Sequence, residues 1–264
     1  MLQIDTIDQM KEKIGQYFGQ ATATCGETGG TEEIPLFQAK DRYLAEEILV
    51  DTLQNKNQLI YNKGQRITVK EVGILAGLGH AMVQVYSKPV VSIITVGEEL
   101  VSIFEEPGPG QIRDINAYML MALVEETGAK IGGISLVRNI ESELKKGFKD
   151  ALDRSDIVIL CGDLLENKKE LCELLDSYGE PGVITQGLES NASSDCVVSV
   201  LKDEHCCCCS RSKLAVALSS NPSEAISSYL TVLDYFIKRY YFKAEDEKQR
   251  DSSQLLDDLY KQMK

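Results

Sequence analysis

The chain alternates short apolar runs with longer amphipathic segments between about residues 88 and 243. The runs 90–97 (VVSIITVG), 156–162 (DIVILCG) and 213–218 (KLAVAL) are almost wholly apolar, as is typical of strands buried on both faces of a parallel sheet. Segments of ten or more residues with helical spacing of apolar positions follow them. This alternation predicts βαβ units, and therefore an α/β fold in which helices cover both faces of a mostly parallel sheet.

The pattern also predicts where this core begins and ends. Residues 88–243 form the three-layer α/β/α core, and residues 1–87 form a small N-terminal appendage of helical and extended segments. Residues 244–264 are polar and are expected to form a helical tail. The long helix at 225–242 carries several aromatic residues. They are interpreted either as an interface between copies or, more simply, as a stripe that faces the core. These residues are Tyr229, Tyr235, Phe236 and Tyr240.

Polar side chains follow three of the predicted strands, at the point where each strand ends. Glu98 and Glu99 follow the first run, Asp163 follows the second, and Asn221 and Pro222 come shortly after the third. The carboxyl ends of parallel strands meet at one edge of a sheet, where ligands bind in a crevice. We therefore expect these residues to lie close together at one edge.

A second polar cluster, Arg113, Asp114 and Asn116, stands where the next helix begins. Asp114 or Asn116 is the expected N-cap, and the helix adds the positive end of its dipole to the same edge. Small residues and free helix N-termini suit a phosphate-bearing ligand, and carboxylates suit a divalent cation beside it. The alternative is that these residues only cap helices and solvate strand ends, and the pattern alone leaves both interpretations open.

Charge and apolar content exclude some classes of function. The net charge of −13 and the pI of about 4.7 argue against a nucleic-acid partner, because phosphates would be repelled. No apolar run is long enough to span a bilayer, and residues 1–19 are too polar for a signal peptide. These features predict a cytoplasmic protein with no membrane partner.

The chain has eight cysteines, and four of them are contiguous at 206–209. Without a secretory signal, reduced thiols are expected. Adjacent thiols cannot easily all point at one ion, so a loop of variable composition is favoured over a dedicated zinc site. Cys161 ends a predicted strand, and a buried structural thiol is favoured there over a nucleophile. Neither His80 nor His205 has a partner at catalytic spacing.

The stretch from 96 to 120 resembles the MoeA family of molybdopterin molybdotransferases, which includes the gephyrin E domain. VGEEL at 96–100 is similar to the family's T-G-[DE]-E-L, and PGQIRDIN at 109–116 is similar to its P-G-Q-I-x-[DN]-x-N. Upstream, 39–47 (AKDRYLAEE) and 59–91 also resemble family segments. The likeness covers about 36 to 165 well, and it implies a fold of the MogA/MoaB type.

The resemblance implies that molybdate is inserted into adenylylated molybdopterin, with Mg²⁺ present and AMP released. It implies catalytic roles for Glu99, Asp114 and Glu170, with Glu99 and Asp114 also as metal ligands. Molybdopterin and molybdate would be the substrates or ligands. The residues expected to bind them are Gly97, Glu98, Arg113, Asn116, Gly162, Asp163, Asn221 and Pro222.

The chain departs from the family pattern at several places. The family's G-G-x-S-x-G-x-x-D loop becomes CGDLLENKKE, where Asp163 and Leu165 replace a glycine and the serine, and Glu170 replaces the aspartate. The P-G-K-P lysine and the D-G-Y-A lobe have no clear counterpart, and the polar tail stands where the family has a β domain. These losses weaken anion binding more than cation binding.

Three hypotheses follow for the function. The chain is a reduced molybdotransferase completed by a homodimer or a molybdenum-cofactor paralogue, a module that binds the pterin or a nucleotide without turnover, or a scaffold. Substitution of Glu99 or Asp114 distinguishes them, since it would abolish turnover, weaken binding or change nothing.

Overall fold

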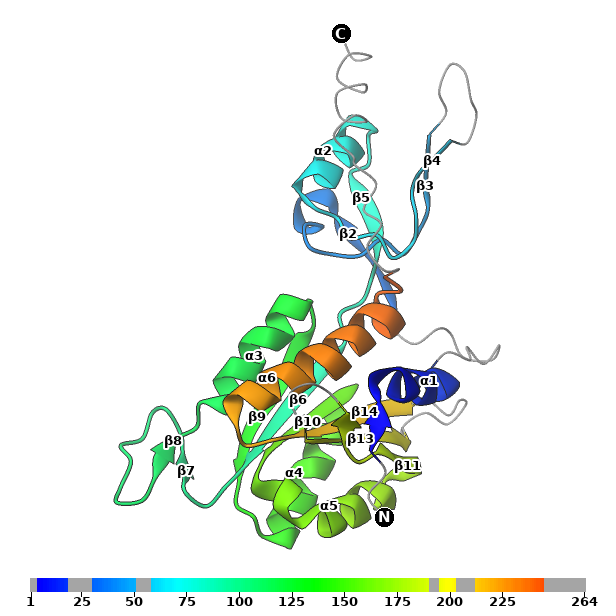
Figure 1. Ribbon diagram of the computed structural model, residues 1–264. Helices are drawn as coiled ribbons and strands as arrows, with labels where there is room; N and C mark the ends of the chain where they lie inside the picture. Colours follow the sequence, from blue (N-terminus) through cyan, green and yellow to red (C-terminus); the bar gives the residue numbers. More distant parts are fainter. Residues whose placement is uncertain (1–3, 19–29, 51–57, 190–194, 203–211, 245–264) are drawn as a thin grey trace. The chain divides into compact units, whose positions relative to one another are not determined.

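The computed structural model describes residues 4–18, 30–50, 58–189, 195–202 and 212–244 (Figure 1). The chain forms two compact units, Met1–Thr28 with Pro89–Phe236 and Gly29–Lys88 with Ile237–Lys264. These units differ from the predicted segments 1–87 and 88–243, because the first helix belongs to the α/β unit and residues 237–244 belong to the smaller one. The predicted tail at 244–264 lies outside the described residues except for its first residue.

A six-stranded sheet forms the centre of the α/β unit, in the order β11-β13-β14-β10-β6-β9. The last four of these strands are parallel, and β13 and β11 continue the sheet in antiparallel pairing. The predicted mostly parallel sheet is therefore confirmed. The bounds are β6 Val90–Val96, β9 Lys130–Val137, β10 Ile157–Gly162, β11 Gly179–Thr185, β13 Cys196–Lys202 and β14 Ser212–Leu218.

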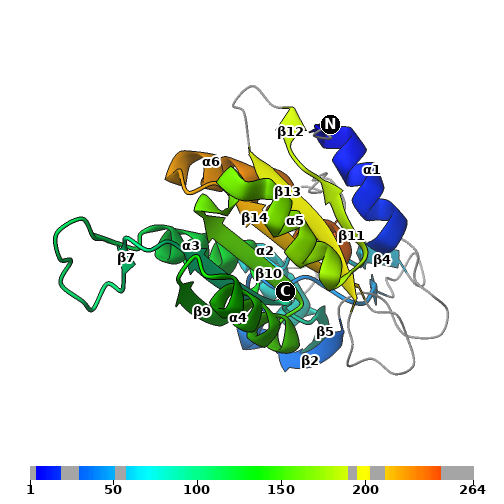
Figure 2. The same cartoon turned by 90° about the horizontal axis from the view of Figure 1, so that it is seen from below.

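Helices cover both faces of this sheet, which gives the predicted three layers (Figure 2). On one face lie α3 (Asn116–Thr127) and α6 (Pro222–Ser228), which continues as the π-helix η3 (Tyr229–Asp234). On the other lie α4 (Glu141–Arg154) and α5 (Lys168–Ser177). None of the described helices is long and apolar enough to cross a membrane.

Strand residues alternate between these two faces. Ile94 and Val96 of β6, with Val158 and Leu160 of β10, join the buried cluster formed with α4 and α5. Because successive side chains of a strand point to opposite faces, Thr95 and its β10 neighbour in register, Cys161, point toward α3 instead. The alternation therefore places the buried side chains of Thr95 and Cys161 on the face that α3 covers.

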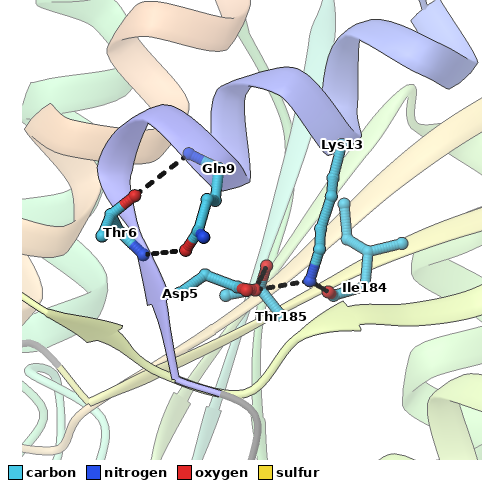
Figure 3. A network of polar contacts seen from close by, with 6 residues as sticks. All are labelled: Asp5, Thr6, Gln9, Lys13, Ile184 and Thr185. Carbon is cyan, nitrogen blue, oxygen red and sulfur yellow. Dashed lines mark hydrogen bonds and ion pairs between the residues drawn. The ribbon is translucent and has the colours of Figure 1, made fainter.

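The N-terminal helix α1 (Ile7–Phe18) is joined to the rest of the α/β unit by a partly buried ion pair (Figure 3). Lys13 Nζ donates to Asp5 Oδ2 at 2.7 Å and to the carbonyl of Ile184 at 2.9 Å, and Thr185 Oγ1 also donates to Asp5 Oδ2 at 2.7 Å. The strand β1 (Asp5–Thr6) pairs with β12 (Leu188–Glu189). Asp5 is 4% exposed, so its charge depends on these partners.

The smaller unit has its own apolar core, and its helix α2 begins at the predicted N-cap Thr68. Thr68 accepts from the N–H of Lys70 while Glu71 accepts from the N–H of Thr68, and Gly79 follows the helix with φ +86°. Phe242 stacks on Tyr43 with ring centroids 4.5 Å apart. The bounds are β2 Thr31–Pro35, η1 Leu36–Gln38, β3 Ile48–Val50, β4 Gln58–Tyr61, α2 Val69–Gly77, β5 Met82–Tyr86 and η4 Ile237–Tyr241.

The aromatic residues of the last long helix are mostly buried. Tyr229 and Phe236 are fully buried, and Tyr240 is 7% exposed. Phe236 packs edge-to-face against Phe18 of α1 with centroids 4.7 Å apart. The stripe therefore faces the interior, as the simpler of the two interpretations predicts.

Candidate functional site at the carboxyl edge of the sheet

Three neighbouring parallel strands end together at one edge of the sheet. The end of β10 lies between the ends of β6 and β14, with Gly162 paired to Val96 and Cys161 paired to Leu218. The polar residues that follow these strands therefore share one edge, as the sequence predicts. The structure thus confirms the convergence on which the candidate site depends.

The carboxylates at the end of β6 differ in their surroundings. Glu98 is exposed and Glu99 is half-buried. The Glu99 carboxylate lies over Gly97, where an added Cβ would be 3.0 Å from both carboxylate oxygens. The N–H of Gly97 donates to the carbonyl of Val137 at the end of β9, at 3.3 Å. Glu99 therefore offers oxygen ligands close to the backbone of the strand end.

A loop that projects from the unit connects this strand end to α3 (Figure 1). It holds two short parallel strands, β7 (Leu100–Val101) and β8 (Ile112–Arg113). The guanidinium of Arg113 pairs with the almost fully exposed Glu106, with 3.0 Å between Nη2 and Oε1. Arg113 is thus part of a surface ion pair, and a role in ligand binding stays a prediction.

Asp114 is buried two residues before the start of α3. It is 4% exposed, and its Oδ1 accepts from the N–H of Ala117 at 3.0 Å. Its Oδ2 accepts from Thr95 Oγ1 at 2.5 Å. The N-cap of α3 is Ile115, so the predicted N-cap at Asp114 or Asn116 is wrong by one residue, although Asp114 still accepts from an N–H of the first helical turn. Each oxygen already accepts one hydrogen bond from the protein, and binding of a metal ion by Asp114 stays a prediction.

Asn116 joins the start of α3 to the end of β14. Its Nδ2 donates to the carbonyl of Ser220 at 2.8 Å. Its Oδ1 is buried, and no donor for it is found among the described residues. A buried acceptor without a donor is costly to leave in place, so this oxygen is suited to an N–H or O–H of a ligand.

Asn221 and Pro222 have a structural role that accounts for their presence. Asn221 Oδ1 accepts from the N–H groups of Ser223 at 3.0 Å and Glu224 at 3.3 Å, and Pro222 occupies the first turn of α6. Such an Asn-Pro pair is a usual helix start. The carbonyl of Ser220, directly before this pair, accepts from Asn116. This segment therefore bounds the candidate site on the β14 side.

The segment after β10 does not form a polar cradle. It is the 3₁₀ helix η2 (Asp163–Asn167), in which Leu164 and Leu165 are buried in the core cluster with α4 and α5. Asp163 is half-buried at its start, and Glu170 is exposed in the first turn of α5. Both follow β10 in the chain, and their roles toward a ligand stay predictions.

Arg138 is a cation at this edge that the sequence analysis does not identify. It directly follows β9, the fourth parallel strand, and forms a two-point ion pair with Glu143 of α4. This pair lowers the pKa of the Glu143 carboxyl and raises the pKa of Arg138, and Glu98 raises the pKa of Arg138 further. The signal available in the sequence was a charged residue directly after the run 130–137.

No group of three or more His, Cys, Asp or Glu side chains is arranged to hold a metal ion within the described ranges. Magnesium, however, is commonly held by one or two carboxylates together with substrate phosphates. Glu99 fits that arrangement better than Asp114, since the Asp114 carboxylate already accepts hydrogen bonds from the protein. The cysteine block at 206–209 and His205 lie outside the described residues.

Cys161 is a buried thiol beside Asp114. Burial raises its pKa to about 12, with a smaller contribution from the Asp114 charge, and its Sγ donates to the carbonyl of Ser219 at 3.3 Å. With this pKa only about one thiol in ten thousand is ionised at pH 8. These features favour the structural interpretation of this cysteine.

We expect iodoacetamide at pH 8 to leave Cys161 unmodified in the folded chain and to modify it after addition of urea. The half-buried Cys172 should react faster, because burial raises its pKa less. Mass spectrometry of the separate peptides measures both. Rapid native labelling of Cys161 would show an accessible, ionised thiol and contradict this account.

Comparisons with known proteins agree with this geometry. Residues 92–164 match the sequence family described as a probable molybdopterin binding domain. That span runs from β6 through the projecting loop, α3, β9 and α4 to the end of β10, so it contains two of the strands that form the edge. Over this span the chain is similar to molybdopterin molybdenumtransferases.

Curated relatives and solved structures support this assignment at two levels. The chain is 35% identical over 99 residues to a molybdopterin molybdenumtransferase of Mycobacterium tuberculosis, and 38% identical over 113 residues to one of Bacillus subtilis. These matches cover 38% and 40% of this chain, and 23% and 25% of the relatives. They therefore span about a quarter of the length of those transferases.

The fold likeness extends further along the chain. A molybdopterin biosynthesis MoeA protein from Pyrococcus horikoshii superimposes with a TM-score of 0.72 at 17% identity, over 90% of this chain and 80% of that one. A molybdenum cofactor biosynthesis protein from Pyrococcus furiosus gives 0.64 at 18% identity, over 92% and 74%. At these identities the structures show a common fold.

Proposed function

We propose that this MoeA-like chain binds molybdopterin, or its adenylylated form, at the carboxyl edge of β14, β10 and β6, as a protein of molybdenum cofactor biosynthesis. One observation carries the proposal. The molybdopterin-binding family match at 92–164 covers the strand end at Glu99, Asp114 before α3 and the strand end at Gly162, and the structure brings these three points to a single edge.

The side chains at this edge suit different parts of such a ligand. The unpaired Oδ1 of Asn116 suits an N–H donor of the pterin ring. The N-terminus of α3 favours a phosphate, although the Asp114 carboxylate offsets part of its positive dipole. Glu99 supplies a carboxylate for Mg²⁺ shared with the phosphate, and Asp163 and Glu170 form the acidic β10 side of the edge.

The transferase reaction belongs to this proposal as its catalytic form. Magnesium, when bound, would neutralise the phosphate charge that develops as AMP leaves. Glu99 would hold that ion, and Asp114 would keep Thr95 and the start of α3 in position. Asn116 and the Ser220 carbonyl would orient the ligand. A second copy of the chain or a molybdenum-cofactor paralogue would complete the transferase.

A second candidate function is binding without turnover. The observation in its favour is the segment after β10, where Leu164 and Leu165 turn into the core and Asp163 adds a negative charge. A segment of this kind offers fewer donors to an anionic transition state than a glycine-rich loop does. The same ligand would then be held at the same edge and passed on unchanged.

The experiment combines two measurements on the full chain. We expect saturable binding of molybdopterin under anaerobic conditions, and about tenfold weaker binding of the adenylylated form with Mg²⁺ after Glu99→Gln. AMP release that depends on molybdate and exceeds the Glu99→Gln background indicates the transferase. Binding without AMP release indicates the second function. Absence of binding contradicts both.

A further inference from the structure

The carboxyl edge needs a cation if it is to hold an anionic ligand. Glu98, Glu99 and Asp163 all stand at this edge, and carboxylates repel phosphate or molybdate. The cations on its two outer sides differ in availability. Lys168 is held by Asp195 and is 21% exposed, whereas the Arg138 side chain is 66% exposed.

Arg138 lies in a suitable position. It follows Val137, which pairs with Val96 of β6 and accepts from the N–H of Gly97. It therefore stands level with the strand end that bears Glu98 and Glu99. Glu98 follows β6 by one residue beyond Gly97, so it and Arg138 stand just beyond the ends of neighbouring strands, and Glu98 raises the pKa of Arg138.

The contact that Arg138 makes now is one that an oxyanion can replace. Both Nε and Nη2 of Arg138 donate to the two carboxylate oxygens of Glu143. The planar fork of a guanidinium fits two oxygens of a phosphate or molybdate in the same way. The pair with Glu143 is exposed, so water and salt weaken it, and a doubly charged oxyanion attracts the guanidinium more strongly than a single carboxylate does.

We propose that Arg138 is the oxyanion-binding group of this edge and that Glu143 holds it until a phosphate or molybdate group takes its place. This inference rests on the proposed function, because it assigns the anionic part of the same ligand. Arg138 would then supply positive charge at an edge that otherwise bears the carboxylates Glu98, Glu99 and Asp163. Glu143 acts as an internal competitor, so removing it should strengthen anion binding.

The test is titration of the full chain with molybdate alone and with inorganic phosphate alone, at low salt. We expect Arg138→Gln to weaken binding about tenfold and Glu143→Gln to strengthen it about threefold. The two opposite changes are expected from the exchange of partners and not from a general loss of structure. If Arg138→Gln weakens the binding of both anions, the site is a general oxyanion site. If it weakens the binding of only one, that anion is the group that Arg138 holds.

Two variants with the same changes of net charge serve as controls. Arg154 ends α4 at the opposite edge of the sheet, where it contacts Ser92 and Ser135. Glu141 lies in the same helical turn as Glu143 but pairs with Lys145. We expect Arg154→Gln and Glu141→Gln to change the affinity less than about twofold.

Equal effects of Arg138→Gln and Arg154→Gln would overturn the inference, as would equal effects of Glu143→Gln and Glu141→Gln. It would also be overturned if neither anion bound saturably up to about 10 mM. Molybdopterin binding that does not depend on Arg138 would overturn the role of Arg138 and leave the proposed function intact. Oxyanion binding that depends on Arg138, without any molybdopterin binding, would overturn the proposed function instead.

Discussion

Gly162→Ala is expected to destabilise the α/β unit by about 4 kcal/mol or to prevent its folding. Gly162 has φ +143° and ψ −162°, a region that side-chain-bearing residues rarely adopt, and an added Cβ would lie 2.1 Å from the carbonyl oxygen of Val96. Relief of that clash would separate β10 from β6, since the Cβ is fixed to the backbone of Gly162 and the atom that it meets belongs to the backbone of Val96. Hydrogen exchange of the β6 and β10 amides, followed in urea, measures the loss.

Gly110→Ala is the matched control for this substitution. Gly110 also has a positive φ, +81°, but an added Cβ would meet no atom within 4 Å. It should cost only about 1 kcal/mol, which is the backbone contribution alone. If Gly162→Ala costs no more than Gly110→Ala, the close approach of the two strand ends is not what requires glycine at this position.

Asp114→Ala is expected to destabilise the same unit by about 2–3 kcal/mol, even without any ligand. The change leaves the Thr95 hydroxyl and the Ala117 N–H buried without their acceptor. A residue that served only to bind a metal ion would behave in the opposite way, because its removal would relieve a buried charge. Urea unfolding without and with Mg²⁺ distinguishes these cases.

Asp114→Asn and Thr95→Val refine this prediction. Asparagine keeps an acceptor for the Ala117 N–H and should cost about 1 kcal/mol. Thr95→Val removes the other partner with little change in volume, and the double variant should show a coupling energy of about 1 kcal/mol with Asp114→Ala. Additive costs would mean that the hydrogen bond between Thr95 and Asp114 contributes nothing to stability.

The arrangement of the central strands of the α/β unit can be predicted from the sequence. The β-branched run 90–97 and the apolar run 156–162 have no polar face, so they can only be interior strands between two layers of helices. The convergence of their ends follows from parallel pairing. The place of α1 does not follow from such patterns, because it depends on Lys13 and Asp5 meeting Ile184 and Thr185, far away in the sequence.

The sequence predicts the location of the candidate site better than it predicts the contacts between the residues there. Glu99 and Asp114 were predicted as a pair of metal ligands, but the partner that the structure shows for Asp114 is Thr95. That contact requires the start of α3 to pack over β6, which spacing does not reveal. The sequence pattern does not single out Arg138, because it is one charged residue directly after Lys130–Val137, and its importance depends on the strand order that places β9 beside β6.

The most direct test of the central claim is a crystal structure of the full chain grown anaerobically with molybdopterin. The account predicts ligand density at the carboxyl ends of β14, β10 and β6, in contact with Glu99 and Asn116, with an anionic group next to Arg138. A ligand bound at any other surface, while this edge remains empty at saturating concentration, would contradict it.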